Sequence, residues 1–259
     1  MTASDPAPQR RIPFEQAFNF RDLGGYRAHD GRTLRWRTLF RSDGLQAMTD
    51  ADRSRFSDLG IRTVVDLRNP TSVERGPAAV PQPVTVHPLP FIDDEGLRAF
   101  SEQFDGIPSS EWYADVLQRG QASGVIRQAF DVFCDPATYP ASFNCSLGKD
   151  RAGLMAALLL GAVGVDVQQI VDDYALSEGN LGPLRERYEA NREEYVRKSR
   201  EKGEEPQAPM KPEAYQSPQI WMRGALDAIQ AEHGSLRAFI EAQEVAGADL
   251  LRLADLLLE

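Results

Sequence analysis

Short apolar runs alternate with longer helical patterns along this chain. Residues 61–67 include the pair Val64-Val65 and have the length of a buried parallel strand. Residues 84–91 give a second strand candidate, which is broken by proline, and residues 142–144 give a third. Strands that alternate with helices predict an α/β fold, with a mostly parallel central sheet flanked by helices on both faces.

Turn and capping residues divide the rest of the chain into further elements. Residues 24–25 and 30–31 are Gly-Gly and Asp-Gly pairs between short apolar segments, which predicts a small hairpin. Residues 49–60 are expected to form a helix with Thr49 as its cap. Helical patterns also occupy residues 98–134 with a loop at 106–109, residues 151–163, residues 165–177 with Asp166 as cap, and residues 218–259 as two extra C-terminal helices.

The pattern gives no reason to divide residues 1–259 into separate domains. A chain of 259 residues with 42% hydrophobic residues is long enough for one large core. Residues 1–12 are polar and rich in proline, which predicts a loose tail. Residues 185–206 are densely charged and predict a solvated helix with ion pairs between residues i and i+4.

Charge and cysteine content limit the possible functions. The net charge is -10, and an acidic protein lacks the basic face that a nucleic-acid binder needs. A few local cations can still attract a small phosphorylated substrate.

Two cysteines, Cys134 and Cys145, do not form a disulfide framework. The chain start has no apolar signal segment and the longest apolar run is too short to cross a bilayer, so we expect a cytoplasmic protein without membrane insertion.

The segment around Cys145 carries the chemistry. The predicted strand ends at Cys145, and a six-residue turn over residues 146–151 leads into a helix. The first amides of a helix have no intrahelical partner, so they and the helix dipole make an anion site. Gly148 permits the backbone angles of a tight cradle, and the planar fork of Arg151 can bind two phosphate oxygens. The same field stabilises a thiolate at Cys145, placed for in-line attack on phosphorus.

The segment 144–153, NCSLGKDRAG, resembles the signature loop of the protein tyrosine phosphatases, in particular a bacterial branch with dual-specificity and lipid-phosphatase members. Residues 18–26, 39–45, 64–77, 86–94 and 171–188 resemble further segments of that branch, so the likeness covers most of the chain. It implies a phosphatase fold with extra C-terminal helices, a phosphorylated protein or phosphoinositide as substrate, and no metal or organic cofactor. Relatives are also exported without a signal, so cytoplasmic is only the default.

Carried over by position, the resemblance assigns roles to residues. Cys145 becomes the nucleophile and Arg151 the phosphate-binding arginine. The amides of the loop bind phosphate, and the loop residues are Ser146, Leu147, Gly148, Lys149 and Asp150. Lys149 adds a cation at the pocket, which in similar enzymes accompanies tolerance for phosphoinositides and phosphoserine.

The general acid and the lid are also implied by the resemblance. The acid falls at Asp93, with Asp94 and Asp150 as alternatives, because spacing does not fix its identity. The charged residues 185–215 correspond to a helical lid over the active site. Arg21 with Asp22, and Asp66 with Arg68, are expected to have structural roles.

Two departures from the family pattern affect the expected chemistry. Asn144 replaces a histidine, and an amide never carries a positive charge, so we expect a less stabilised thiolate. Ala152 replaces a hydroxyl residue that assists thiolate departure, so we expect slower hydrolysis of the phosphocysteine.

These departures motivate an alternative function, a phosphate-binding module with weak or no turnover. Retention of both Cys145 and Arg151 favours the enzyme, and sulfur transfer or arsenate reduction is disfavoured because only Cys134 is available as a second thiol.

Overall fold

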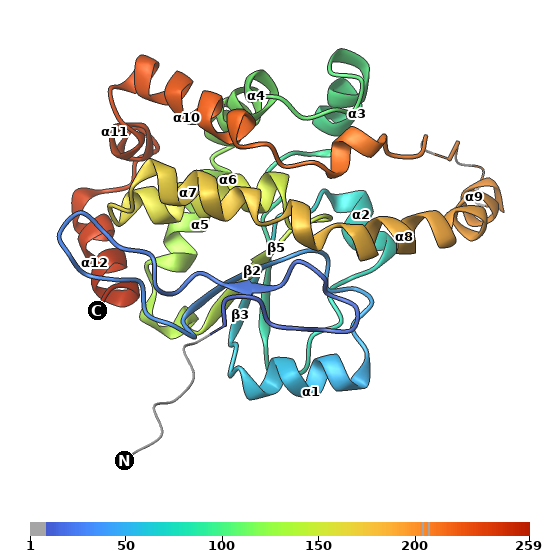
Figure 1. The fold of residues 1–259 in the computed structure, drawn as a ribbon, viewed down its shortest axis with the longest axis horizontal. Helices are drawn as coiled ribbons and strands as arrows, with labels where there is room; N and C mark the ends of the chain where they lie inside the picture. The colour runs from blue at the N-terminus through green and yellow to red at the C-terminus, as the bar shows by residue number, and fades with distance from the viewer. Residues whose placement is uncertain (1–8, 202, 204, 207) are drawn as a thin grey trace.

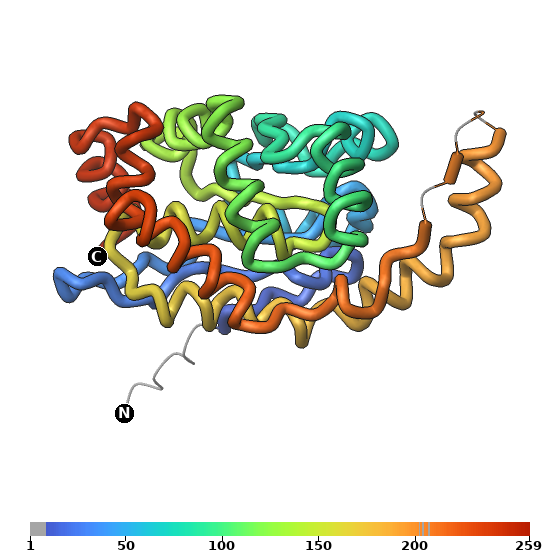
Figure 2. The backbone as a smooth tube through the Cα atoms, turned by 90° about the horizontal axis from the view of Figure 1, so that it is seen from above, coloured from blue at the N-terminus to red at the C-terminus, as the bar shows by residue number. Residues whose placement is uncertain are grey.

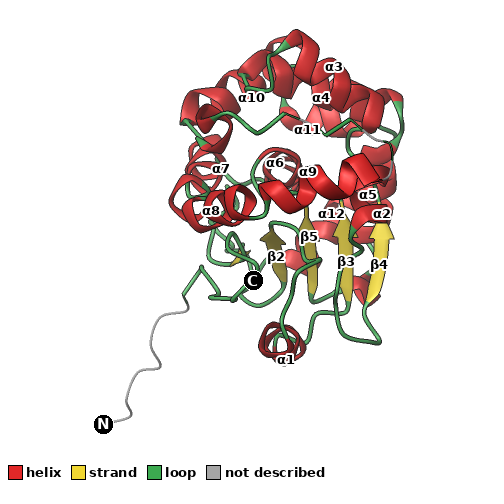
Figure 3. Cartoon of the chain, turned by 90° about the vertical axis from the view of Figure 1, so that its right-hand side faces the viewer, coloured by secondary structure: helices red, strands yellow, loops and turns green. Residues whose placement is uncertain are grey.

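A five-stranded, mostly parallel sheet forms the centre of the molecule. The computed structural model describes residues 9–259 apart from 202, 204 and 207. The strands are β1 (Arg21–Asp22), β2 (Leu39–Ser42), β3 (Thr63–Asp66), β4 (Thr85–Pro88) and β5 (Ala141–Asn144), in the spatial order β1-β2-β5-β3-β4. Only β1 is antiparallel, and Figure 3 shows β2, β5, β3 and β4 pointing the same way. The predicted α/β class is confirmed.

Helices cover both faces of the sheet, as the strand sequences require. Successive side chains of a strand point to opposite faces, and here both faces are apolar. Phe40 and Val64 pack toward α1 (Asp50–Asp58), whereas Leu39 and Val65 belong to the larger core on the other face. Figure 1 shows α1 on one side of the sheet and the helices α6 (Asp150–Ala162) and α7 (Val167–Ala175) on the other.

Most predicted elements are found close to their predicted bounds. Thr49 caps α1 in a capping box with Asp52, and Asp166 caps α7 by accepting from Gln168 N. The helical region before β5 consists of α3 (Asp94–Gln103), α4 (Ser110–Ala122) and α5 (Val125–Phe133). β4 differs from the buried strand that we expected, because it lies at the sheet edge and is largely exposed. An edge position tolerates the proline that ends it.

The C-terminal region contains three helices rather than the predicted two. They are α10 (Gln219–His233), α11 (Leu236–Glu241) and α12 (Gly247–Leu257). Gly234 has a positive φ of 81° and ends α10, and the Ser235 side chain then caps α11 by accepting from Ala238 N. The residue that ends α10 and the residue that caps α11 are neighbours. The apolar pattern of the sequence therefore continues across the break between the two helices.

The predicted N-terminal tail differs in part from expectation. Residues 1–8 of the predicted tail lie outside the described residues, but residues 10–12 are not loose. Asp22 N donates to Arg10 O, and Ile12 N donates to Phe20 O, so this segment runs along β1. A helix long and apolar enough to cross a membrane is absent from the described part of the chain.

The charged region folds into two helices, α8 (Gly182–Ala190) and α9 (Arg192–Glu201). The expected i,i+4 ion pairs are present between Arg185 and Glu189, Lys198 and Glu194, and Arg197 and Glu201. Residues 202, 204 and 207 of the predicted lid lie outside the described residues. Figure 2 shows α9 extending away from the body of the molecule, with the chain returning beside α8.

Candidate active site

The loop from Cys145 to Lys149 lies at the carboxyl end of β5, in the middle of the sheet. It connects β5 directly to α6, between the parallel neighbours β2 and β3. Gly148 has a φ of 66°, and a Cβ there would come within 2.5 Å of Asp43 N and 2.7 Å of Ser42 O. Because those atoms are backbone, only glycine fits, and the loop is pressed against the end of β2.

Arg151 reaches back across the loop from the first turn of α6. Its Nη2 donates to Ser146 Oγ at 2.9 Å and its Nη1 to Leu67 O at 3.4 Å. Cys145 is 1% exposed and Arg151 is 7% exposed. The cap position of α6 is Lys149, which makes no side-chain capping bond, so no side chain from that position takes up the first helical amides. The structure thus brings thiol, guanidinium and helix start together, an arrangement that suits a tetrahedral anion.

A buried ionic cluster supports the loop from behind. Asp173 on α7 accepts from Arg21 of β1, Arg41 of β2 and the Tyr26 hydroxyl. Burial opposes ionisation of Asp173, but the two guanidinium groups outweigh it and hold its pKa well below the usual range. Asn19 extends the cluster, because its Nδ2 donates to Leu147 O at 3.0 Å. Sequence reasoning missed this cluster, since residues as far apart as 21 and 173 give no local signal.

The structural pairs expected from the sequence are present only in part. Asp66 binds Arg68 at 2.6 Å and also accepts from Asn144 Nδ2 at 3.1 Å, so this pair braces the residue before Cys145. Arg21 does not pair with Asp22, since its partner is Asp173. Asp22 instead accepts backbone N–H groups of Gly24 and Arg37. Adjacent strand residues point to opposite faces, which separates the two side chains.

The Lys149 side chain binds protein groups, whereas we expected it to add a cation at the pocket. Its ammonium is fully buried and donates to the carbonyl oxygens of Ala214 and Gln216, and it pairs with Asp150 at 3.2 Å. The segment that returns from the lid supplies these carbonyls, so Lys149 joins the loop to that segment. Its cation is therefore engaged by protein groups, and only its backbone N–H remains a phosphate-binding candidate.

The three candidate acids have different surroundings. Asp93 caps α3, with one carboxylate oxygen accepting from Gly96 N at 2.8 Å, and the residue is exposed. Asp94 accepts from the Asn69 side chain and from Thr71 N. Asp150 accepts from the Tyr113 hydroxyl at 2.6 Å, in addition to its contact with Lys149.

Tyr113 was not singled out from the sequence. It is fully buried, and burial together with the charge of Asp150 raises its pKa well above the usual value, so it remains a hydrogen-bond donor. Its hydroxyl also lies 2.7 Å from that of Tyr174. The Asp150 carboxylate is thus held in a buried network, whereas Asp93 stays at the surface.

An apolar cluster joins α8 to the loop. Leu147 packs with Leu181 and Leu184, and Phe18, Tyr188 and Tyr215 pack against these three. Burial raises the pKa of the Tyr188 phenol, and the charges of Cys145 and Arg151 also affect it. The first helix of the predicted lid is therefore docked on Leu147, although its outer face is charged.

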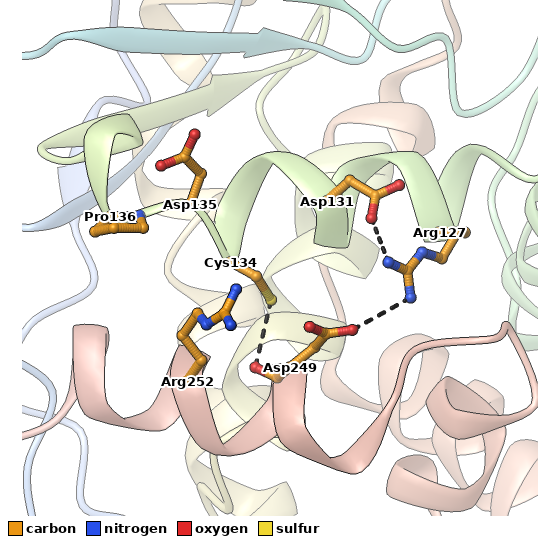
Figure 4. Close-up of a pocket in the computed structure, with 7 residues that line it drawn as sticks. All are labelled: Arg127, Asp131, Cys134, Asp135, Pro136, Asp249 and Arg252. Atoms are coloured by element: carbon orange, nitrogen blue, oxygen red, sulfur yellow. Dashed lines mark hydrogen bonds and ion pairs between the residues drawn. The ribbon is translucent and has the colours of Figure 1, made fainter.

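Cys134 is separated from this site by the length of β5. It follows α5, whereas Cys145 follows the other end of β5, and both thiols are free. Figure 4 shows Cys134 beside Asp249 of α12, to whose carbonyl oxygen its thiol donates at 3.4 Å. Burial raises the pKa of Cys134 to about 11. Cys134 therefore belongs to the contact between α5 and α12 and not to the loop.

The described part of the chain contains no group of three or more His, Cys, Asp or Glu side chains that could hold a metal ion.

Comparisons with known proteins give a consistent result. The model of a family described as the tyrosine phosphatase family matches residues 12–259. The triple specificity protein phosphatase PtpB of Mycobacterium tuberculosis is 32% identical over 202 residues, covering 66% of this chain and 70% of that protein. A protein of Cupriavidus necator named as a tyrosine-protein phosphatase is 32% identical, covering 63% of this chain and 61% of its own length. A tyrosine-protein phosphatase of Nostoc commune is 28% identical, covering 53% and 47%.

Proposed function

Because the chain belongs to the tyrosine phosphatase family, whose members are phosphoric monoester hydrolases, we propose that it hydrolyses phosphotyrosine monoesters through a phosphocysteine intermediate. The observation that supports this most is one loop that carries Cys145, the start of α6 and Arg151 together. We propose that the loop amides from Ser146 to Asp150 bind the phosphate oxygens.

The proposed reaction has two displacements on phosphorus. The Cys145 thiolate attacks, the S–P bond forms, and the P–O bond to the leaving group breaks while Asp93 donates its proton to the departing oxygen. Asp93 then accepts a proton from water, which attacks phosphorus, breaks the S–P bond and releases phosphate and thiolate. Arg151 and the amides hold the equatorial oxygens throughout both steps.

The candidate substrates belong to several classes of phosphomonoester. The relative from Mycobacterium tuberculosis is named a triple specificity protein phosphatase, so we propose that the substrate range extends beyond phosphotyrosine. Phosphoserine, phosphothreonine and phosphoinositide esters are the additional substrates to test. Engagement of Lys149 by Ala214 and Gln216 removes the argument for lipid substrates that was based on its free cation. The aromatic residues Phe18, Tyr188 and Tyr215 beside the loop favour a flat aryl leaving group.

The test of this function is hydrolysis of p-nitrophenyl phosphate in the presence of a chelator, followed by rapid acid quenching and mass spectrometry of the peptide that contains Cys145. Turnover with a phosphorylated Cys145 peptide supports the proposal. Binding of phosphate or vanadate without turnover would instead favour the phosphate-binding module, with Asn144 and Ala152 as the first residues to revert.

Replacement of Asp93 by asparagine should lower kcat for a phosphotyrosine peptide by about 100-fold, because the leaving phenolate loses its proton donor. Asparagine keeps the cap of α3, since its side-chain oxygen still accepts from Gly96 N. The matched control is Asp94→Asn, whose carboxylate is bound to Asn69 and Thr71. Equal losses in the two variants, or a larger loss in Asp150→Asn, would reassign the acid.

We further propose that residues 185–215 act as a lid within a single phosphatase domain. The support is Tyr188, which packs against the cluster of Leu147, Leu181 and Leu184 from a helix whose other face is charged. Among the described residues of α9, Ser199 is the one that is buried, and an element with few buried contacts can open locally.

The lid has a direct consequence for access to the thiol. Tyr188→Ala should raise the rate at which iodoacetate alkylates Cys145 several-fold, because the aromatic ring that covers the loop is removed. The control Glu186→Ala lies on the exposed face of α8 and should leave the rate unchanged. An unchanged rate in Tyr188→Ala would contradict the lid.

A further inference from the structure

Arg41 of β2 donates hydrogen bonds to two backbone carbonyl groups at the back of the loop. Its Nη2 donates to Gly148 O at 2.8 Å and to Lys149 O at 3.1 Å, and its side chain is fully buried. Lys149 O also accepts from Gly153 N at 2.7 Å in the first turn of α6. Two consecutive carbonyl groups of the loop are therefore fixed on the side of Arg41.

This anchoring constrains the neighbouring amides. In a peptide unit the carbonyl and the following N–H point in opposite directions. The carbonyls of Gly148 and Lys149 are held toward Arg41, so the N–H groups of Lys149 and Asp150 point away from it, toward the open side of the loop. One guanidinium thus orients two of the amides that the proposed function assigns to phosphate.

The charges around Arg41 do not cancel among themselves. Arg21 and Arg41 share the single carboxylate of Asp173, which leaves one surplus positive charge in the buried cluster. Burial and the nearby Arg21 lower the pKa of Arg41 to about 10, so it stays charged at neutral pH, and the Cys145 charge acts in the opposite direction. Arg41 Nε is buried without a hydrogen-bond partner in the described part of the protein.

The other groups around the thiol come from α6, α8, the end of β2 and β5. Arg151 lies in α6 and Tyr188 in α8, and the charges of Cys145 and Arg151 both act on the Tyr188 phenol. Asp43 follows β2, accepts from Phe18 N and Asn19 N, and has a pKa that burial raises to about 6. Asn144, directly before the thiol, is neutral at every pH.

We propose that Arg41 is a positioning residue of this active site, which orients the loop amides through Gly148 and Lys149 and supplies the buried positive charge that stabilises the Cys145 thiolate. The inference rests on the proposed function, but the effect of the Arg41 charge on the thiolate does not require turnover. A fixed cation in a buried site favours an anion more strongly than an exposed cation does.

The test measures the rate of Cys145 alkylation by iodoacetate as a function of pH, in the full chain, with the modified peptide identified by mass spectrometry. Arg41→Gln keeps one hydrogen-bond donor but removes the charge. We expect the midpoint of its pH profile to rise by about one pH unit. Arg41→Lys keeps the charge, so its midpoint should stay near that of the wild type while phosphate inhibits alkylation less effectively, because an ammonium does not reproduce the planar fork.

Asp173→Asn should shift the midpoint of the alkylation profile in the opposite direction, and this test does not depend on the folding of the Arg41 variants. It removes the carboxylate that neutralises the cluster, so the midpoint should fall. Unchanged midpoints in Arg41→Gln and Asp173→Asn would overturn the charge role, and unchanged phosphate protection in Arg41→Lys would overturn the orienting role. Since alkylation needs no turnover, a shifted midpoint in a protein that fails to hydrolyse p-nitrophenyl phosphate would reject the proposed function and keep the Arg41 inference.

Discussion

Replacement of Cys145 by serine is expected to lower the hydrolysis of p-nitrophenyl phosphate by at least about 10⁴-fold, because a buried hydroxyl is a far weaker nucleophile than a thiolate. The exchange of sulfur for oxygen is small, and Cys145 is only 1% exposed in a well-packed loop, so the fold should be retained. Phosphate binding should survive, since Arg151 and the start of α6 are unchanged. The measurements are steady-state kinetics and phosphate binding by calorimetry.

Cys134→Ser is the matched control for this variant. Cys134 lies beyond the opposite end of β5, and its thiol contacts Asp249 O of α12. Its replacement should leave kcat unchanged. Residual activity of Cys145→Ser near the wild-type level would show that another group attacks phosphorus, and the phosphocysteine mechanism would then be wrong.

Arg151→Lys is expected to lower kcat/KM by about 10³-fold, although the charge is conserved. The guanidinium already bridges Ser146 Oγ and Leu67 O, which fixes its plane across the loop. A lysine ammonium is a point charge and cannot bind two equatorial oxygens of the transition state in one plane. The loss should appear in kcat as well as in KM, because the charge to be stabilised spreads during transfer.

The control for Arg151→Lys is Arg119→Lys, an exposed arginine that pairs with Asp115 on α4. This conservative change should leave both kinetic constants unchanged. Thermal unfolding of both variants separates a kinetic effect from a loss of folded protein. A loss below tenfold in Arg151→Lys would contradict a bidentate role of the guanidinium.

The local elements of the fold could be predicted because their signals are local. Thr49 with Asp52 and the cap Asp166 define helix starts within a few residues of themselves. The buried pair Val64-Val65 predicts a strand covered on both faces. The break at Gly234 was missed because an apolar periodicity continues on both sides of it.

The candidate site could be predicted where its residues adjoin in sequence. Cys145, Gly148 and Arg151 belong to one turn, and the strand before them and helix after them fix their geometry. The role of Lys149 could not be predicted, since its partners Ala214 and Gln216 reach the loop only through the returning chain. The same holds for Tyr113, whose hydroxyl meets Asp150 from α4.

The sequence alone determined the α/β class and the six-residue turn that connects Cys145 to Arg151 at the start of a helix, because hydrophobic periodicity and a short turn are properties of neighbouring residues. Only the tertiary structure decided which charges support that loop. Arg41 and Asp173 lie 132 positions apart and meet because β2 pairs with β5 while α7 packs behind α6. Burial strengthens this ion pair, since electrostatic interactions are stronger away from water. A local sequence pattern does not predict which buried charges will meet.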